Sequence, residues 1–146
     1  MSVGRICVRD VDLADADESV QAAARRMNSR NVGTLIVLDK DSKPIGILTD
    51  RDLAVRVVGQ GLVPAQTTVG EVMSLSPVRV REDTPIETAL AHMRSGPYRR
   101  LPVVDDDGRL IGLVSLDDVL ELLSEELQAI GSLVRHEGPA SLAPGL

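Results

Sequence analysis

The chain has 146 residues, of which 43% are hydrophobic and 26% are charged, and this composition is typical of a globular protein rather than a disordered one. A net charge of −6 argues against nucleic acid as a partner, because neutralising phosphates requires a basic surface. The single cysteine, Cys7, excludes an intrachain disulfide, and without an apolar stretch of about 18–20 residues or a secretory signal we expect a cytoplasmic protein away from membranes.

The first half of the chain predicts the order strand, helix, strand, strand, helix. Period-3.6 apolar residues indicate the helices, and short apolar runs on either side of a polar turn indicate a β-hairpin. The expected elements are a strand at residues 11–13, a helix between 19 and 31, strands at 35–38 and 45–48, a helix at 50–58 and a connector at 59–68.

The second half predicts the same order again. Thr84-Pro85-Ile86-Glu87 is typical of a helix start, with Thr84 as the N-cap and Pro85 as the first helical residue. The remaining expectations are a strand at 78–80, a helix stop at 96–97, strands at 101–104 and 111–114, a last helix to about Ile130 and a disordered tail at 131–146.

The two halves align when the chain is shifted against itself by 66 residues, which indicates a tandem repeat with copies at 3–62 and 69–130. Two copies are too few for a solenoid, so we expect them to pack about a pseudo-twofold axis. Helices layered on sheets in this order predict an α+β, or mixed α/β, fold.

One motif occurs in both copies: Gly, two apolar residues, a hydroxyl residue, two variable residues and Asp. Its members are Gly46, Thr49 and Asp52 in the first copy and Gly112, Ser115 and Asp118 in the second. A hydroxyl and an acid at this spacing match a capping box, which by itself accounts for any single occurrence. However, a helix N-terminus with a hydroxyl also binds phosphate, Asp can accept both hydroxyls of a ribose, and a glycine within a strand suits the close approach of another group. The repeated motif therefore indicates a nucleotide pocket.

Together with Arg99-Arg100-Leu101-Pro102 and the lead-in segments at 3–6 and 69–73, the two copies resemble a tandem pair of cystathionine-β-synthase (CBS) domains, a Bateman module, over about residues 3–130. The resemblance implies repeats that meet through their sheets and two clefts that bind an adenine nucleotide. AMP, ADP or ATP would be the ligand, with NAD or S-adenosylmethionine as further candidates, and no cofactor or metal would be required.

The resemblance also implies roles for particular residues: phosphate contacts by the motif hydroxyls and the arginines, ribose contacts by the motif acids, and adenine packing on aliphatic side chains. The candidate ligand-binding residues are Thr34, Gly46, Thr49, Asp52, Val78, Arg99, Arg100, Leu101, Pro102, Gly112, Ser115 and Asp118. Gly33 and Thr34 stand where the second copy has Arg99 and Arg100. We therefore predict that a second cleft, formed by Ser115, Asp118 and both arginines, binds phosphate more strongly than the first.

Two residues keep alternative interpretations. Arg51 is either a phosphate ligand of the first cleft or a solvated residue of a first helical turn, and Tyr98 either covers a base or is a packing residue.

The sequence shows no Ser-His-Asp arrangement, metal-ligand cluster or Walker-type loop, so we predict a sensor module without catalytic activity. It would act through a homodimer, held by the apolar face of residues 119–130, or through an unknown regulated protein. The alternative is a structural or interaction protein whose clefts stay unoccupied.

Overall fold

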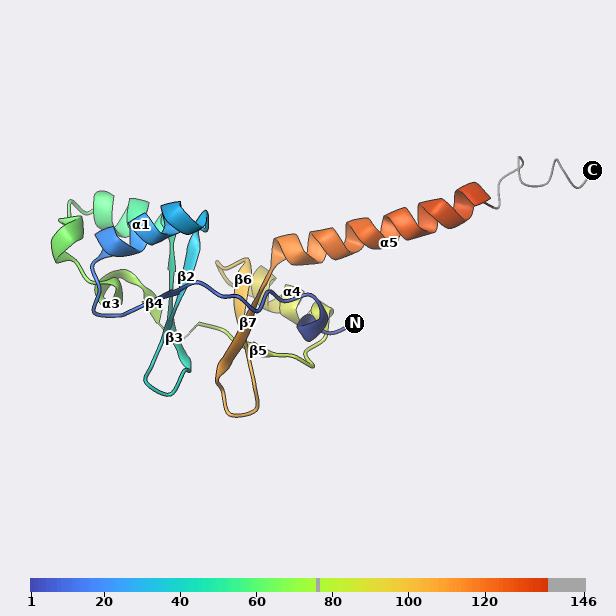
Figure 1. Cartoon of the computed structure of the whole chain (residues 1–146), viewed down its shortest axis with the longest axis horizontal. Coiled ribbons are helices and arrows are strands. Elements are labelled where there is room, and N and C mark those ends of the chain that lie inside the picture. Colours follow the sequence, from blue (N-terminus) through green and yellow to red (C-terminus); the bar gives the residue numbers. More distant parts are fainter. Residues whose placement is uncertain (76, 137–146) are drawn as a thin grey trace, which may run out of the picture.

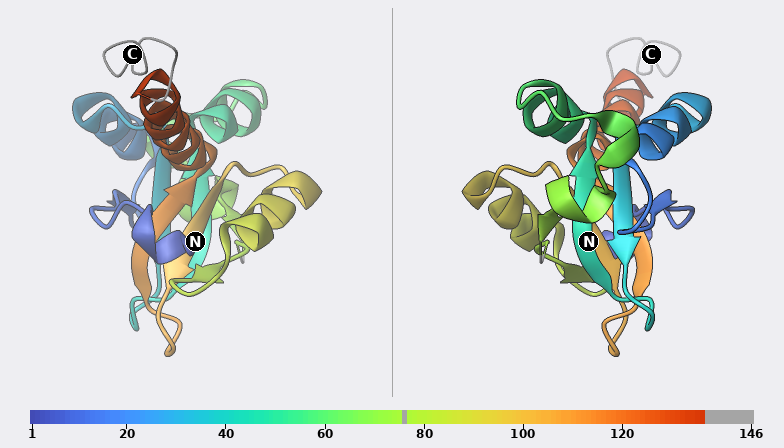
Figure 2. Two further views of the ribbon diagram at one scale, coloured as in Figure 1. Left: turned by 90° about the vertical axis from the view of Figure 1, so that its right-hand side faces the viewer. Right: turned by 90° about the vertical axis from the view of Figure 1, so that its left-hand side faces the viewer.

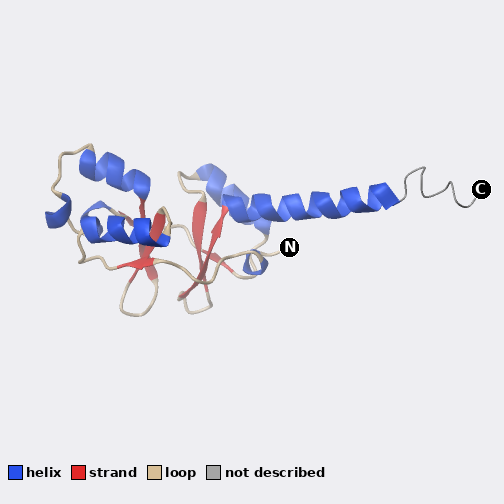
Figure 3. Ribbon diagram, turned by 45° about the horizontal axis from the view of Figure 1, so that its top comes forward, coloured by secondary structure: helices blue, strands red, loops and turns tan. Residues whose placement is uncertain are grey.

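The computed structural model describes residues 1–75 and 77–136. They form two sheets that lie along the middle of the molecule with helices on the outside (Figures 1, 2 and 3). The elements in chain order are η1 (Val3–Arg5), β1 (Leu13–Ala14), α1 (Val20–Arg30), β2 (Thr34–Leu38), β3 (Pro44–Thr49), α2 (Asp50–Asp52), η2 (Leu53–Val58), η3 (Pro64–Gln66), α3 (Val69–Val72), β4 (Ser74–Leu75), β5 (Val80–Arg81), α4 (Ile86–Ser95), β6 (Arg100–Val104), β7 (Leu110–Ser115) and α5 (Leu116–His136).

The two sheets repeat one topology. In the first sheet β1 runs parallel to β2, which forms an antiparallel hairpin with β3. In the second sheet β5 runs parallel to β6, which forms an antiparallel hairpin with β7. Even the register agrees, since Gly46 pairs with Val37 and Gly112 pairs with Val103, in each case just before an irregularity in the ladder. The predicted mixed α+β fold with two related halves is confirmed.

The lead-in segments of the two repeats are exchanged. Val3 packs in the core of the second repeat, and its N–H donates to the Thr84 carbonyl at 2.9 Å. Conversely, Val69 and Val72 of α3 pack in the core of the first repeat, and β4 extends the first sheet beside β3. Each packed unit therefore contains a piece of the other copy's sequence.

Each sheet has one face toward helices and one face toward the other repeat. Leu35, Val37 and Leu48 belong to the first core cluster, which they share with α1 and α3. Ile36 and Ile47 alternate with them and are also fully buried, so they point to the opposite face, toward the second sheet. The hairpin ends of the two repeats also meet, because the Leu110 N–H donates to the Ser42 carbonyl at 2.9 Å.

The helix starts show one correct and one wrong prediction. Ser19 is the N-cap of α1, where its hydroxyl accepts from the Ala22 N–H at 3.1 Å. The predicted N-cap role of Thr84 is wrong. Pro85 takes the extended N-cap conformation, and the Thr84 hydroxyl instead accepts from the Arg81 N–H at 2.9 Å, where it closes the turn before the helix.

The last helix is longer than predicted. α5 runs to His136, so the first six residues of the predicted tail, 131–136, are helical, and residues 137–146 lie outside the described part of the chain. Leu133 and Val134 continue the apolar spacing, and Gly131 lowers helix stability by only about 1 kcal/mol, which a helix of this length tolerates. α5 extends away from the rest of the molecule (Figure 1). Among residues 1–75 and 77–136, no helix has both the length and the apolar character needed to cross a membrane.

Candidate functional site

The repeated motif forms a reciprocal capping box in both copies. The Asp52 N–H donates to Thr49 Oγ1 at 3.2 Å, and the Thr49 N–H donates to Asp52 Oδ2 at 2.9 Å. The matching distances for Ser115 and Asp118 are 3.1 and 2.8 Å. Each box uses one lone pair of the hydroxyl and one carboxylate oxygen, so the hydroxyl proton and the second oxygen remain for another partner. Capping therefore does not exclude ligand binding.

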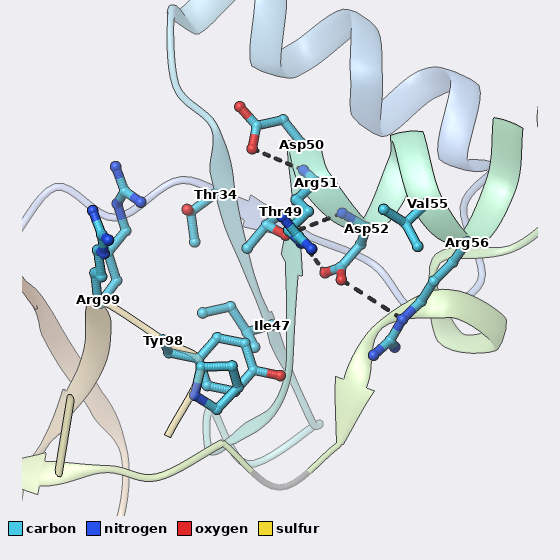
Figure 4. Close-up of a pocket in the computed structure, with 12 residues that line it drawn as sticks. Thr34, Ile47, Thr49, Asp50, Arg51, Asp52, Val55, Arg56, Tyr98 and Arg99 are labelled. Atoms are coloured by element: carbon cyan, nitrogen blue, oxygen red, sulfur yellow. Dashed lines mark hydrogen bonds and ion pairs between the residues drawn. The ribbon is translucent and has the colours of Figure 1, made fainter. Parts of the chain in front are cut away.

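The first pocket, of about 590 Å³, lies at the N-terminus of α2 between the two repeats. Its lining residues are Thr34, Ile47, Thr49, Asp50, Arg51, Asp52, Val55, Arg56, Pro97, Tyr98, Arg99 and Arg100. Figure 4 shows Thr49 and Asp52 on one side of this pocket, with Tyr98 and Arg99 facing them from the other repeat. The pocket thus combines the motif of the first copy with the segment that precedes β6 in the second.

Positive charge predominates in the first pocket, where four guanidinium groups meet two carboxylates. Arg56 is held in place, because its Nε lies 3.7 Å from Asp52 Oδ1 and its NH1 donates to the Val72 carbonyl at 2.9 Å. Arg51, Arg99 and Arg100 are exposed at the rim. This arrangement suits an anionic group placed at the N-terminus of a helix.

A π-helical segment shapes one wall of the same pocket. After the single turn of α2, residues 53–58 of η2 form a π-helix, whose i→i+5 pattern is seen in the Gly59 N–H donating to the Ala54 carbonyl at 2.9 Å. This segment carries Val55 and Arg56, which both line the pocket. The corresponding part of the second repeat is regular helix within α5. π-helical segments occur often at functional sites, because the added residue per turn redirects side chains.

The second pocket is smaller and acidic. It has a volume of about 270 Å³ and is lined by Val8, Asp10, Val11, Asp12, Asn31, Val32, Gly33, Thr34, Arg100, Leu113, Ser115 and Asp118. Arg30 lies behind it, with its Nε 2.7 Å from Asp12 and its NH2 3.4 Å from Asp10. The hydrogen bond to Asp12 raises the pKa of Arg30 above its ordinary value, so this ion pair persists at any physiological pH. Three carboxylates against Arg100 make the pocket itself unsuited to a phosphate.

Thr34 lies between the two pockets and lines both of them. It is only 6% exposed, and its hydroxyl has no hydrogen-bond partner within the part of the chain that the structure describes. A buried hydroxyl without a partner costs about 1–3 kcal/mol. A ligand that hydrogen-bonds to Thr34 would remove this penalty, so Thr34 marks the junction of the pockets as a binding position.

Seven of the twelve predicted site residues line the pockets: Thr34, Thr49, Asp52, Arg99, Arg100, Ser115 and Asp118. They combine differently from the prediction. Arg99 lies in the first pocket, opposite Thr49 and Asp52, and only Arg100 reaches the second. The expectation that both arginines serve the second cleft is wrong, because the β6 lead-in of one repeat faces the motif of the other. Arg51 and Tyr98, which the sequence left open, also line the first pocket.

The two motif glycines have a packing role. A Cβ atom on Gly46 would collide with the Met73 thioether, and one on Gly112 would lie 3.0 Å from both Cys7 Sγ and the Val8 carbonyl oxygen. The group that approaches each strand closely is therefore the exchanged lead-in segment rather than a ligand. These glycines line neither pocket among the described residues.

Leu101, Pro102 and Val78 also lie outside the two pockets, as far as the described residues define them. Leu101 is part of the second core, Pro102 is buried in β6 opposite Leu113, and Val78 is exposed before β5. Aliphatic contact for a base comes instead from Ile47 and Val55 in the first pocket and from Val8, Val11 and Leu113 in the second.

Sequence comparison matches the CBS domain family to two segments of the chain, residues 3–59 and 69–125. The uncharacterized protein MK0525 of Methanopyrus kandleri is 36% identical over 122 residues, which cover 84% of this chain and 62% of that protein. Inosine-5′-monophosphate dehydrogenase of Methanocaldococcus jannaschii is 33% identical over 116 residues, which cover 80% of this chain but 22% of the enzyme. The chain thus spans less than two thirds of the length of these two relatives.

Solved structures match over most of their length. The CBS domain pair of MJ0100, in complex with 5′-methylthioadenosine and S-adenosyl-L-methionine, superposes with a TM-score of 0.77 at 26% identity, covering 86% of this chain and 98% of that one. CBSX2, in complex with AMP, superposes with a TM-score of 0.74 at 27% identity, covering 85% of this chain and 96% of that one. The ligands in both structures carry an adenosyl group.

Proposed function

Because the chain belongs to the CBS domain family, with two domains in tandem, we propose that it is a regulatory module that binds an adenosyl ligand without catalysing a reaction on it. The observation that carries this proposal is the first pocket. There the Thr49–Asp52 capping box of one repeat faces Arg99 and Arg100 of the other. The AMP complex of CBSX2 and the adenosyl complex of MJ0100 support the same class of ligand.

In the first pocket we assign the phosphate to the positive groups. The N-terminus of α2, the Thr49 hydroxyl and the guanidinium groups of Arg99 and Arg100 would hold it, with Arg51 as a further cation at the rim. Asp52 would accept from the ribose through Oδ1, since Oδ2 is already used by the Thr49 N–H. The base would lie against aliphatic side chains and the ring of Tyr98. AMP fits this distribution of charge.

The second pocket, with Asp10, Asp12 and Asp118 in its lining, would reject a phosphate and accept an uncharged or cationic adenosyl compound. The MJ0100 complex contains compounds of this kind, since 5′-methylthioadenosine is neutral and S-adenosyl-L-methionine carries a sulfonium. We therefore propose that the two pockets select ligands by charge.

A ligand panel tests this function. The melting temperature of the chain would be recorded with AMP, ADP, ATP, NAD, S-adenosylmethionine and 5′-methylthioadenosine. A ligand at 100 times its dissociation constant stabilises the folded state by about 2.7 kcal/mol. If no compound raises the melting temperature, the alternative gains support, namely an interaction protein whose clefts stay unoccupied and whose motifs act as helix caps.

The output of the module would pass through its own oligomer or a regulated partner protein. The relatives that are longer than this chain fit that view, because in them a matching segment forms only part of a larger protein. The dehydrogenase match covers 22% of the enzyme, so it extends no catalytic activity to this chain.

A further inference from the structure

α5 carries an apolar stripe that the rest of the chain leaves uncovered. Leu120, Leu123, Leu127, Ile130 and Val134 are between 52% and 68% exposed, and of the helix only Val119 is buried. Figure 1 shows that the helix leaves the body after its first turns and extends alone. We propose that this stripe pairs with the same stripe of a second copy, so that two α5 helices form an antiparallel coiled coil.

The helix needs a partner to remain ordered. An isolated helix is marginal in water, and most helical stability in proteins comes from packing an amphipathic face. From Leu120 onward the apolar face of α5 meets solvent in a single chain, although the helix continues to His136. The described residues of the same chain provide no surface for it, so the cover must come from another molecule.

The spacing of the stripe identifies the type of packing. Starting at Leu116, the apolar residues follow one another after 4, 3, 4, 3 and 4 positions, which is the 3.5-residue period of a heptad seam. A helix that docks on a globular surface usually has a broader apolar face. Ser124 and Gly131 flank the seam and allow a second helix to approach closely.

The charges along α5 favour a second copy in the antiparallel orientation. Asp117, Asp118, Glu121, Glu125 and Glu126 lie in its first half, whereas Arg135 and His136 form its last turn. A parallel, in-register pair would place each acid beside the same acid of the partner. An antiparallel pair brings Arg135 toward the acidic half of the partner helix, and this arrangement is self-complementary, as a twofold interface must be.

The position of the body favours the same orientation. The body lies at the N-terminal end of α5, as Figure 1 shows, and the chain has a net charge of −6. An antiparallel pair places two like-charged bodies at opposite ends of a helix pair about 30 Å long, which reduces their repulsion. A parallel pair would bring them side by side. The seam is centred near Leu127, where it crosses the twofold axis.

The first test is the oligomeric state of the full chain by sedimentation equilibrium at micromolar concentration, with no nucleotide added. We expect a dimer. Leu127→Asp should weaken the dimer by about 100-fold or more, because it places a charge in the seam of both copies. Gln128→Asp is the matched control, since it adds the same side chain one residue away on the outer face and should leave the dimer intact. A thermal melt of each variant checks the body, which Leu127 does not contact.

A monomeric wild type would overturn the proposal, as would equal responses of the two variants. The orientation is tested by spin labels at single cysteines in a Cys7→Ser background, with distances measured between the two copies. Gln128→Cys lies near the centre and gives a short distance in either orientation. His136→Cys gives a similar distance in a parallel coil but roughly 25 Å of added axial separation in an antiparallel one. Similar distances at the two positions would overturn the antiparallel arrangement. None of these measurements depends on whether a nucleotide binds.

Discussion

Asp52 and Asp118 allow the chain to serve as its own control, because both cap a helix in the same way but lie in pockets of opposite charge. Replacing either with Asn retains one side-chain oxygen, which can still accept from the N–H of Thr49 or Ser115. The change removes the negative charge and the second acceptor oxygen. In the first pocket that oxygen is the one assigned to ribose.

The stability effect should be small and similar at both sites. Loss of the charge–dipole interaction at a helix N-terminus costs about 0.5–1 kcal/mol. Asp52→Asn also loses the pair with Arg56, but this pair is 3.7 Å long and the Arg56 side chain is 48% exposed, so it adds at most a few tenths of a kcal/mol. The two variants should therefore melt within about 0.5 kcal/mol of each other.

The effect on binding should differ. If Asp52 accepts from the ribose of AMP, Asp52→Asn leaves a ribose hydroxyl without its partner and weakens AMP by about 1–3 kcal/mol, or roughly 5- to 150-fold in dissociation constant. Asp118→Asn should change AMP affinity by less than about twofold, because the acidic second pocket does not take the phosphate.

Isothermal titration with AMP and one apo melt for each protein suffice for this comparison. Equal losses of AMP affinity in the two variants, or a loss only in Asp118→Asn, would refute the assignment of AMP to the first pocket. An unchanged affinity in Asp52→Asn would refute the ribose role of this residue.

Three further outcomes are expected. Arg99→Ala should weaken AMP by about 10-fold or more while leaving adenosine binding nearly unchanged, because it removes a phosphate contact only; equal losses for both ligands in titrations would contradict this. Gly112→Ala should destabilise the fold by about 1–3 kcal/mol in a urea melt, since the Val8 carbonyl lies 3.0 Å from the added methyl group, and stability equal to wild type would show that the exchanged segment yields easily. Cys7 has a pKa raised mainly by burial, so its thiol should react slowly with iodoacetamide at pH 7.5, faster as the pH rises, and at once after unfolding; fast native labelling at neutral pH would contradict the buried placement.

The element order and the motif could be predicted because each depends on residues close in sequence. Ser19 and Asn31 enclose α1 through an N-cap hydrogen bond and a left-handed C-cap, both short-range interactions. The capping boxes at Thr49 and Ser115 are likewise made within three residues. The repeat added further information, because a pattern that occurs twice at a constant offset of 66 residues is unlikely to arise by composition alone.

The exchange between repeats could not be read in the same way, and it decides which arginine serves which pocket. Val3 lies 66 residues before Val69, and each packs in the core of the other repeat, yet nothing local to either segment distinguishes packing on its own repeat from packing on the next. Both arrangements bury the same apolar side chains, so the choice rests on long-range geometry. The π-helix of η2 is a similar case, because the sequence over residues 53–58 satisfies a regular helix equally well.

The exchange also gives a physical reason for the difference between the pockets. Since each pocket joins the motif of one repeat to the β-strand lead-in of the other, a substitution in one copy changes the charge of the pocket built on the other copy's motif. Arg99 in the second copy thereby adds a cation opposite Thr49, whereas Gly33, its counterpart, adds none opposite Ser115. The acids that lead into β1, Asp10 and Asp12, act on the second pocket alone. Two copies of one motif can in this way come to select ligands of different charge while both capping boxes remain unchanged.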